Sequence, residues 1–243
     1  AFMSSLSTRD LERFRTDDLV GAIVHAHSVL SGSTKPQVEL FNPGFEEFGW
    51  QSDYTVCVIH HPDIPFLVDS LRIELLQQEI EVHTQANMVL SVSRDSKDRV
   101  TEMRLSQTQV ESCESLIWLE IDRSTQKDVL RRIKVSLQNV LQDLRLVVDD
   151  FEPLRSKVKT IGSMLTQTAH DASQVAEIAL FLDWLADDHF TFLGYEYFSL
   201  RSGDTLQLDA PQSLGLSRNQ CLTAHQDKTR IRTRKPEYTD DLV

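Results

Sequence analysis

Apolar residues near the start of the chain recur at the spacing of a helix. Between Ser7 and about Leu30 they follow a period close to 3.6 residues. These positions are Leu11, Phe14, Leu19, Ile23 and Val24. A hydroxyl at Ser7 or Thr8 could cap the free amides of the first turn, and Gly32 interrupts the pattern. The sequence therefore predicts an N-terminal helical segment over residues 1–35.

Residues 54–95 follow a different order, which is strand, turn, helix, strand. A β-branched run opens this segment, and the sequence HPDIP at residues 61–65 breaks it. Apolar residues then return at helical spacing, at Leu67, Val68, Leu71, Leu75 and Leu76. Further strand candidates are residues 37–41, 88–93, 100–105 and 116–121. Together these elements predict an α+β domain over residues 36–125.

The order of these elements leaves one edge of the predicted sheet open. The helix expected after Ile121 is not followed by a nearby strand. Residues 37–41 could supply the missing edge from the N-terminal side, in a circular rearrangement with the order ββαββα. The alternative is an unpaired edge strand, which is less favourable because open edges promote aggregation.

From Leu130 the apolar positions follow one another at intervals of three and four. They are Leu130, Ile133, Leu137, Val140, Leu144, Val147, Phe151, Leu154, Val158, Ile161 and Leu165. A continuous helix of this length would span roughly 54 Å, and Pro153 is expected to kink or interrupt it. The spacing resumes at Val175, Ile178, Leu182 and Leu185. We therefore expect an antiparallel helical hairpin over residues 126–188, with its two apolar stripes packed together.

The last segment, residues 189–243, is predicted to begin a second β-rich unit. A strand at residues 190–200 would pair with residues 205–208 through the turn between them. Residues 228–235 alternate basic and neutral side chains, which indicates a solvated strand with one charged face rather than a nucleic-acid patch. Because the chain ends directly after this strand-like segment, we expect the unit to be truncated.

Composition limits the partners of this chain. Its net charge of −12 disfavours nucleic acid and anionic membrane, because both require a basic face. No apolar run approaches the roughly 18 residues of a transmembrane helix, and the first residues lack a signal peptide, so we expect a cytoplasmic protein. The three cysteines are far apart and odd in number, which argues against a disulfide framework or a metal site among them.

Two features of the sequence bear on the chemistry of this chain, namely the spacing of its glycines and the histidines near residue 60. None of the eight glycines is separated from another by one residue, so no G-x-G-x-x-G turn for a dinucleotide can be written. His60, His61 and Asp63 could suggest a metal site, but adjacent residues on a strand point to opposite faces. The preferred interpretation is structural: Asp63 caps the following helix and Pro65 lies in its first turn. We therefore predict no catalytic, cofactor or metal site in this chain.

Two motifs carry a resemblance to a known family. The sequence DIPFLVDS at residues 63–70, followed by Glu74 and His83, resembles the N-terminal region of the large bacterial NAD-specific glutamate dehydrogenases. The sequence WLADDHFTFLGY at residues 184–195 resembles the same family. The resemblance implies a ferredoxin-like ACT-type domain, the hairpin and a second β-rich unit. It also implies a parent that uses NAD to convert L-glutamate to 2-oxoglutarate and ammonium, and a regulatory and assembly role for this inactive segment.

The same resemblance implies where an effector would bind. ACT domains hold amino acids between their first strand and the next helix, which corresponds here to Asp63, Ile64, Pro65 and Phe66, with His83 near by. Phe66 replaces the usual glycine, so we expect weak binding or none. The expected partners are the rest of the parent chain, sister subunits and an amino-acid effector. The alternative function is a free-standing amino-acid-binding regulator of the ACT type.

Overall fold

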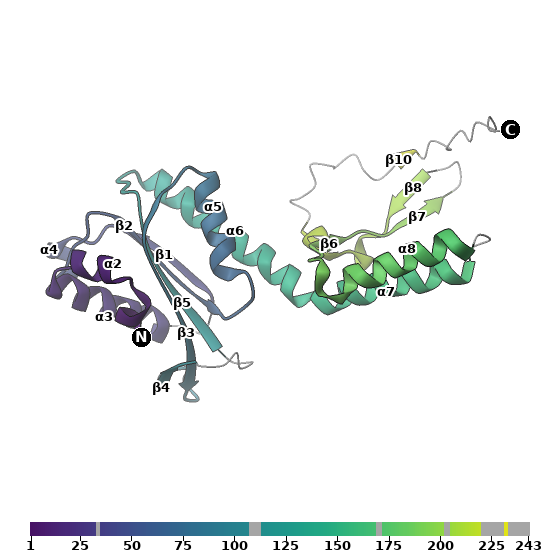
Figure 1. The fold of residues 1–243 in the computed structure, drawn as a ribbon. Coiled ribbons are helices and arrows are strands. Elements are labelled where there is room, and N and C mark those ends of the chain that lie inside the picture. Colours follow the sequence, from purple (N-terminus) through teal and green to yellow (C-terminus); the bar gives the residue numbers. More distant parts are fainter. Residues whose placement is uncertain (33–34, 107–112, 169–171, 202–204, 220–230, 233–243) are drawn as a thin grey trace. The chain divides into compact units, whose positions relative to one another are not determined.

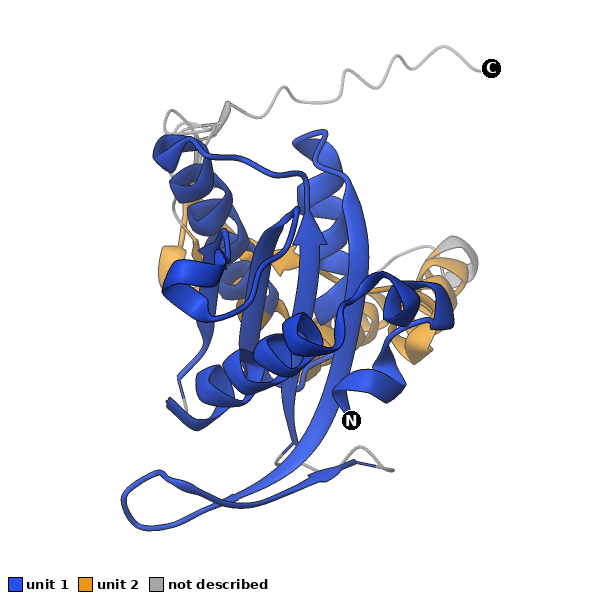
Figure 2. Ribbon diagram, turned by 90° about the vertical axis from the view of Figure 1, so that its left-hand side faces the viewer, with its two compact units in different colours: residues 1–144 blue, residues 145–243 orange. Residues whose placement is uncertain are grey.

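The computed structural model describes residues 1–32, 35–106, 113–168, 172–201, 205–219 and 231–232 (Figure 1). Contacts divide the chain into two compact units, residues 1–144 and residues 145–243 (Figure 2). The chain is α+β, with antiparallel sheets and several helices. The four predicted segments, 1–35, 36–125, 126–188 and 189–243, stay a prediction. No described helix is both long enough and apolar enough to span a bilayer.

The first unit is built on a five-stranded antiparallel sheet in the order β1-β2-β5-β3-β4. The strands are β1 (Gln37–Phe41), β2 (Thr55–Pro62), β3 (Val82–Arg94), β4 (Val100–Leu105) and β5 (Cys113–Ile121). β1 pairs with β2, from Gln37 opposite His60 to Phe41 opposite Val56. The expectation that residues 37–41 form an edge of the sheet is therefore confirmed. β4 extends the opposite edge by pairing with β3.

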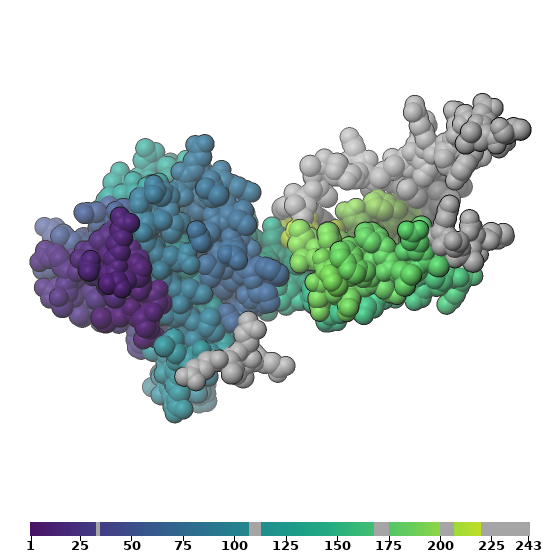
Figure 3. Space-filling model, in the orientation of Figure 1, coloured from purple at the N-terminus to yellow at the C-terminus, as the bar shows by residue number. Residues whose placement is uncertain are grey.

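Helices cover both faces of this sheet. The helices α1 (Phe2–Ser5), α2 (Thr8–Arg13) and α3 (Thr16–Gly32) lie on one side, and α5 (Leu67–Gln77) and α6 (Lys127–Asp149) lie on the other (Figure 1). Figure 3 shows the N-terminal helices, in purple, forming the outer surface of their side. A strand covered on both faces buries all of its side chains. This explains why β2 is buried at every position from Thr55 to His61.

The N-terminal helices differ from the single predicted helix. The chain turns at Phe14 and Arg15, so that α2 and α3 are separate. The Ser7 hydroxyl accepts a hydrogen bond from the Asp10 amide at 3.1 Å, which confirms the predicted cap. α3 approaches the buried Trp50 at Gly21, where an added Cβ would lie 2.3 Å from the indole Cγ. Glycine is therefore required by this contact.

An aromatic cluster fills the space between α3 and the sheet. The rings of Trp50 and Trp118 lie 5.8 Å apart, and Phe2 meets Trp118 edge-on at 5.3 Å. Phe41 and Phe48, the latter in the short helix α4 (Phe45–Phe48), extend the cluster. Both tryptophans are almost completely buried. The aromatic side chains anchor the core of the first unit.

The predicted helical arm is interrupted before Pro153. α6 ends at Asp149, and α7 (Phe151–Thr168) begins two residues later. Pro153 lies in the first turn of α7, where its missing amide has no partner to lose. The buried Asp150 carboxylate accepts a hydrogen bond from the Gly215 amide at 2.7 Å and pairs with Arg218 at 2.8 Å. The residue between the two helices, Asp150, is therefore held by contacts with residues that are distant in sequence.

The predicted packing of the long apolar stripe is wrong in its first half. α6 belongs to the first unit through Leu144, and its side chains Ile133, Leu137, Leu141 and Leu144 are buried. The hairpin is formed by α7 and α8 (Ala172–Trp184) alone. Gly162 of α7 lies against Leu182 of α8, but Ile178 is half exposed. Apolar residues at intervals of three and four predict which face of a helix is buried, but they do not predict the element against which that face packs.

The second unit continues beyond α8 with short elements. A π-helical turn (Leu185–His189) follows α8 at the end of the hairpin. β6 (Gly194–Tyr195) pairs with β9 (Leu214–Gly215), and β8 (Thr205–Leu208) pairs with β7 (Phe198–Arg201) and β10 (Ile231–Arg232). The short 3-10 turns Ala210–Gln212 and Leu216–Arg218 complete this unit. Apart from β10, the basic segment predicted at residues 228–235 lies outside the described residues.

Candidate functional site

The predicted effector loop lies between β2 and α5. The Asp63 amide donates a hydrogen bond to the Cys113 carbonyl at 2.8 Å, and one Asp63 carboxylate oxygen accepts a bond from the Ser115 hydroxyl at 2.6 Å. Both partners belong to β5. The prediction that Asp63 caps α5 is therefore wrong, because its carboxylate is directed to the neighbouring strand instead.

Phe66 occupies the N-cap position of α5 in a left-handed conformation. Its φ is 64°, its side chain makes no capping hydrogen bond, and it is 56% exposed. Pro65 precedes this cap, so it lies outside the first turn where it was expected. Because its ring lies on the surface, Phe66 is not a core anchor, and the weak or absent effector binding expected at this loop stays a prediction. A bulky residue with positive φ carries backbone strain that glycine would avoid.

His83 does not join this loop. Thr55 pairs with Ile121 at one end of the β2 and β5 ladder, and Pro62 pairs with Glu114 at the other. β3 begins with Val82 opposite Ile121. His83 therefore lies at the far end of the sheet from residues 63–66, roughly 23 Å away along the strands at about 3.3 Å per residue. We expected His83 near residues 63–66 because the pairing register of the strands, which decides the end of the sheet at which each residue lies, is not evident from the sequence.

His83 instead lies between two acidic side chains. Its Nε2 is 2.8 Å from one oxygen of Asp122, and its Nδ1 is 4.0 Å from Glu81. The Glu81 amide donates a bond to the other Asp122 oxygen at 2.9 Å. This amide bond, followed by the bond from His83, lowers the pKa of Asp122 below its ordinary value. The Tyr54 ring packs against the imidazole in a tilted arrangement, with 4.4 Å between ring centres.

Glu81, His83 and Asp122 are close enough to hold a metal ion. One imidazole and two carboxylates would suit zinc or manganese. However, the two imidazole nitrogens face different carboxylates, and the Asp122 oxygens already accept two hydrogen bonds. An ion would have to displace these bonds. The arrangement is satisfied as a hydrogen-bonded group that joins the start of β3 to the end of β5.

The side chains of the adjacent histidines in β2 have different partners, as expected for neighbouring residues on a strand. The His60 imidazole is fully buried and donates from Nε2 to Glu114 at 2.7 Å. The His61 Nδ1 lies 2.7 Å from the Pro62 carbonyl oxygen. The two rings bond to different partners, so they do not form one metal site. Nearby, burial raises the pKa of the Cys57 thiol to about 12, which keeps it protonated and unreactive.

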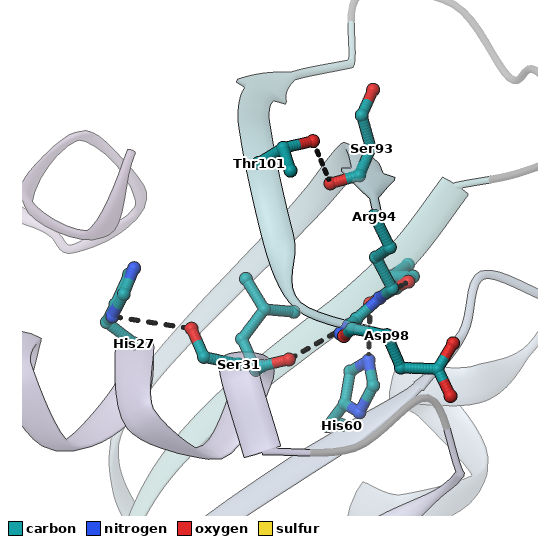
Figure 4. Close-up of polar contacts among 9 residues, drawn as sticks. His27, Ser31, His60, Ser93, Arg94, Asp98 and Thr101 are labelled. Atoms are coloured by element: carbon teal, nitrogen blue, oxygen red, sulfur yellow. Dashed lines mark hydrogen bonds and ion pairs between the residues drawn. The ribbon is translucent and has the colours of Figure 1, made fainter. Parts of the chain in front are cut away.

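Glu114 is the centre of a partly buried ionic network that the sequence did not reveal. Figure 4 shows Arg94, His60 and Asp98 of this network. Arg94 donates to its carboxylate from Nε at 3.1 Å and from Nη2 at 2.7 Å. Arg94 also donates to the carbonyls of Leu30 and Asp98, at 2.9 and 3.0 Å. Burial raises the pKa of Glu114, but the bonds from Arg94 and His60 together lower it below its ordinary value. The network ties the end of α3 to the β3-β4 turn and β5.

Comparison with known proteins adds to this geometry. Residues 1–137 match the family described as glutamate dehydrogenase, ACT1 domain. The chain is 38% identical over 226 residues to an NAD-specific glutamate dehydrogenase of Pseudomonas aeruginosa, a match that covers 89% of this chain and 14% of the relative. It is 37% identical over 242 residues to an NAD-specific glutamate dehydrogenase of Halomonas elongata, covering 96% of this chain and 15% of the relative. The chain thus spans only a small part of the length of these curated relatives.

Proposed function

The chain belongs to the glutamate dehydrogenase ACT1 domain family, and from this membership we propose that it is a non-catalytic regulatory and assembly segment of a large NAD-dependent glutamate dehydrogenase. The parent enzyme would oxidise L-glutamate with NAD and water to 2-oxoglutarate, ammonium and NADH. In this proposal the segment contributes contacts and control rather than reacting groups, and it works in the cytoplasm.

One observation carries the proposal. The match covers nearly all of this chain but only 14 to 15% of relatives that are named as NAD-specific dehydrogenases. The relatives therefore have ample length for a catalytic region outside this segment. The sequence has no paired-glycine turn for a dinucleotide, which also supports a catalytic region outside this segment. A free-standing amino-acid regulator is the second hypothesis, and the great length of both relatives favours the first.

The finer fold assignment is part of the proposal. We assign the first unit to a ferredoxin-like ACT module with the rearranged order ββαββα. Its support is the strand order, in which β1 lies beside β2 at the edge that a later strand would otherwise fill. β4 is then an additional strand at the other edge. Effector binding by Asp63, Ile64, Pro65 and Phe66 stays a prediction, and distance removes His83 from that loop.

The assembly role is supported by the surface of α8. Leu180, Phe181 and Trp184 are each at least half exposed, although they are large and apolar. Phe181 and Trp184 stack at 6.0 Å between ring centres. Clustered apolar side chains on a surface are typical of interaction sites. Sister subunits of a homo-oligomer are the partners that we propose for this face.

The test uses the long parent enzyme with Leu180→Asp in α8. A charge at this exposed position should leave the segment folded but disrupt an apolar subunit contact. We expect a lower assembled mass by light scattering, with the control Glu177→Gln on the same helix unchanged. An assembled mass that Leu180→Asp leaves intact, together with unaltered kinetics, would contradict an assembly role for this face.

A further inference from the structure

A polar pocket of about 360 Å³ opens at the end of the sheet opposite the predicted effector loop. It lies where α2 gives way to α3, against the segment that leads into β2 and against β5. Its lining combines two arginines with three acidic residues. The lining residues are Arg13, Phe14, Arg15, Asp18, Gln51, Ser52, Asp53, Tyr54 and Glu120. A pocket that presents both signs of charge differs from one built for an anion or a cation alone.

Glu120 is the most informative residue of this pocket. It is only 3% exposed, and its carboxylate accepts a bond from the Ser52 hydroxyl at 2.8 Å. Within the described part of the chain, no cationic group lies within ion-pair distance of this carboxylate. A charge held out of water is unfavourable unless it is paired. Glu120 is therefore arranged to receive a positive group from a ligand.

The arginines provide the opposite charge. The Arg13 guanidinium lies 5.0 Å above the Tyr54 ring, which holds the planar group in place. Its nearest carboxylate is Asp10, at 3.8 Å, and its contact with the Thr84 hydroxyl is long, at 3.5 Å. Most of its five donors remain available for a carboxylate.

Asp18 and Arg15, unlike Glu120 and Arg13, already interact with neighbouring protein groups. The buried Asp18 carboxylate accepts the Gln51 amide at 2.9 Å, which fixes the segment that leads into β2. The exposed Arg15 lies 4.0 Å from the same carboxylate. These two residues shape the wall, and the charged groups left for a ligand are the buried Glu120, Arg13 and the exposed Asp53 at the rim.

We propose that this pocket binds a small zwitterion of the α-amino-acid class, with its ammonium group on Glu120 and its carboxylate on Arg13. A simple anion would meet three acidic residues, and a simple cation would meet two guanidinium groups. Only a ligand with both charges satisfies both sides. The inference rests on the proposed regulatory function, and it places the effector away from residues 63–66.

The test is calorimetric and thermal-shift titration of the 243-residue chain with each protein L-amino acid. We expect one or a few of them to bind saturably. The matched analogues of each ligand that lack the ammonium or the carboxylate group should bind at least tenfold more weakly. Glu120→Gln and Arg13→Gln should each weaken binding at least tenfold. The controls Glu47→Gln and Arg132→Gln, which change exposed charges outside the pocket, should not alter it.

Several outcomes would overturn the proposal. These are the absence of binding by any amino acid at millimolar concentration, equal binding of the analogues, or binding that survives Arg13→Gln. Arg13 is partly exposed, so its variant should remain folded even if Glu120→Gln does not. Failure here would leave the assembly test on α8 unaffected, because that test is read from the mass of the long enzyme.

Discussion

At the scale of single residues, the loop before α5 holds a bulky side chain in a left-handed backbone conformation. Phe66 adopts φ of 64°, a conformation that glycine reaches without strain, and its ring projects to the surface. Asp63 is meanwhile bonded to Ser115 rather than to the helix. The geometry of the loop is thus maintained by β5 and not by the side chain at the N-cap.

Phe66→Gly should stabilise the chain or leave its stability unchanged. Relief of the left-handed strain should favour folding by about 1 kcal/mol, and the greater freedom of glycine in the unfolded chain should offset part of it. Urea unfolding of both proteins measures the difference. Glu79→Gly, at another exposed position with φ of 58°, is the matched comparison. A loss of 3 kcal/mol or more would show that the ring is packed after all.

The Glu114 network should make stability depend on pH. Its pKa is lowered in the folded protein, so the unfolded chain binds the proton more tightly. The contribution is therefore fully present above the ordinary glutamate pKa of 4.5, and it is lost as pH falls through the lower folded value. Urea unfolding between pH 7 and pH 3 should show this loss. In Glu114→Gln the corresponding part of the slope should be absent, and an identical slope in both proteins would refute the assignment.

At the scale of elements, local patterns predicted the strands and helices well, but not their neighbours. The β-branched run of β2, the helical spacing of α5 and the edge strand β1 could all be read from the residues. The break between α6 and α7 could not, because it coincides with contacts of Asp150 to Gly215 and Arg218, which are distant in sequence. The same limit explains why His83 was assigned to the wrong end of the sheet and why the Arg94 to Glu114 network was missed.

The assignment of α6 to the first unit gives a prediction for Leu137. Its side chain is fully buried, so Leu137→Asp would place an unpaired charge in the core and should cost several kcal/mol of unfolding free energy. Ile178→Asp changes a half-exposed residue of α8 and should cost far less. Thermal melting of the two variants measures the contrast. Equal shifts in melting temperature would show that α6 does not pack as described.

At the scale of the whole molecule, this family member presents two units with different surfaces. The first covers its sheet on both faces and keeps a pocket of mixed charge at one end. The second presents an apolar face on α8. A pocket of mixed charge and an exposed apolar surface are the features that the proposed roles in control and assembly require. In this account the chemistry of glutamate oxidation takes place elsewhere in the parent enzyme.

The measurement that tests this account most directly is a calorimetric titration of NAD into the 243-residue chain, with an assay of NADH formation from L-glutamate on the same sample. We predict no saturable NAD binding and no NADH formation, because the sequence has no paired-glycine turn for a dinucleotide phosphate. The long parent enzyme is the positive control. Micromolar binding of NAD by the chain, or glutamate-dependent NADH formation, would contradict the proposal that this segment is non-catalytic.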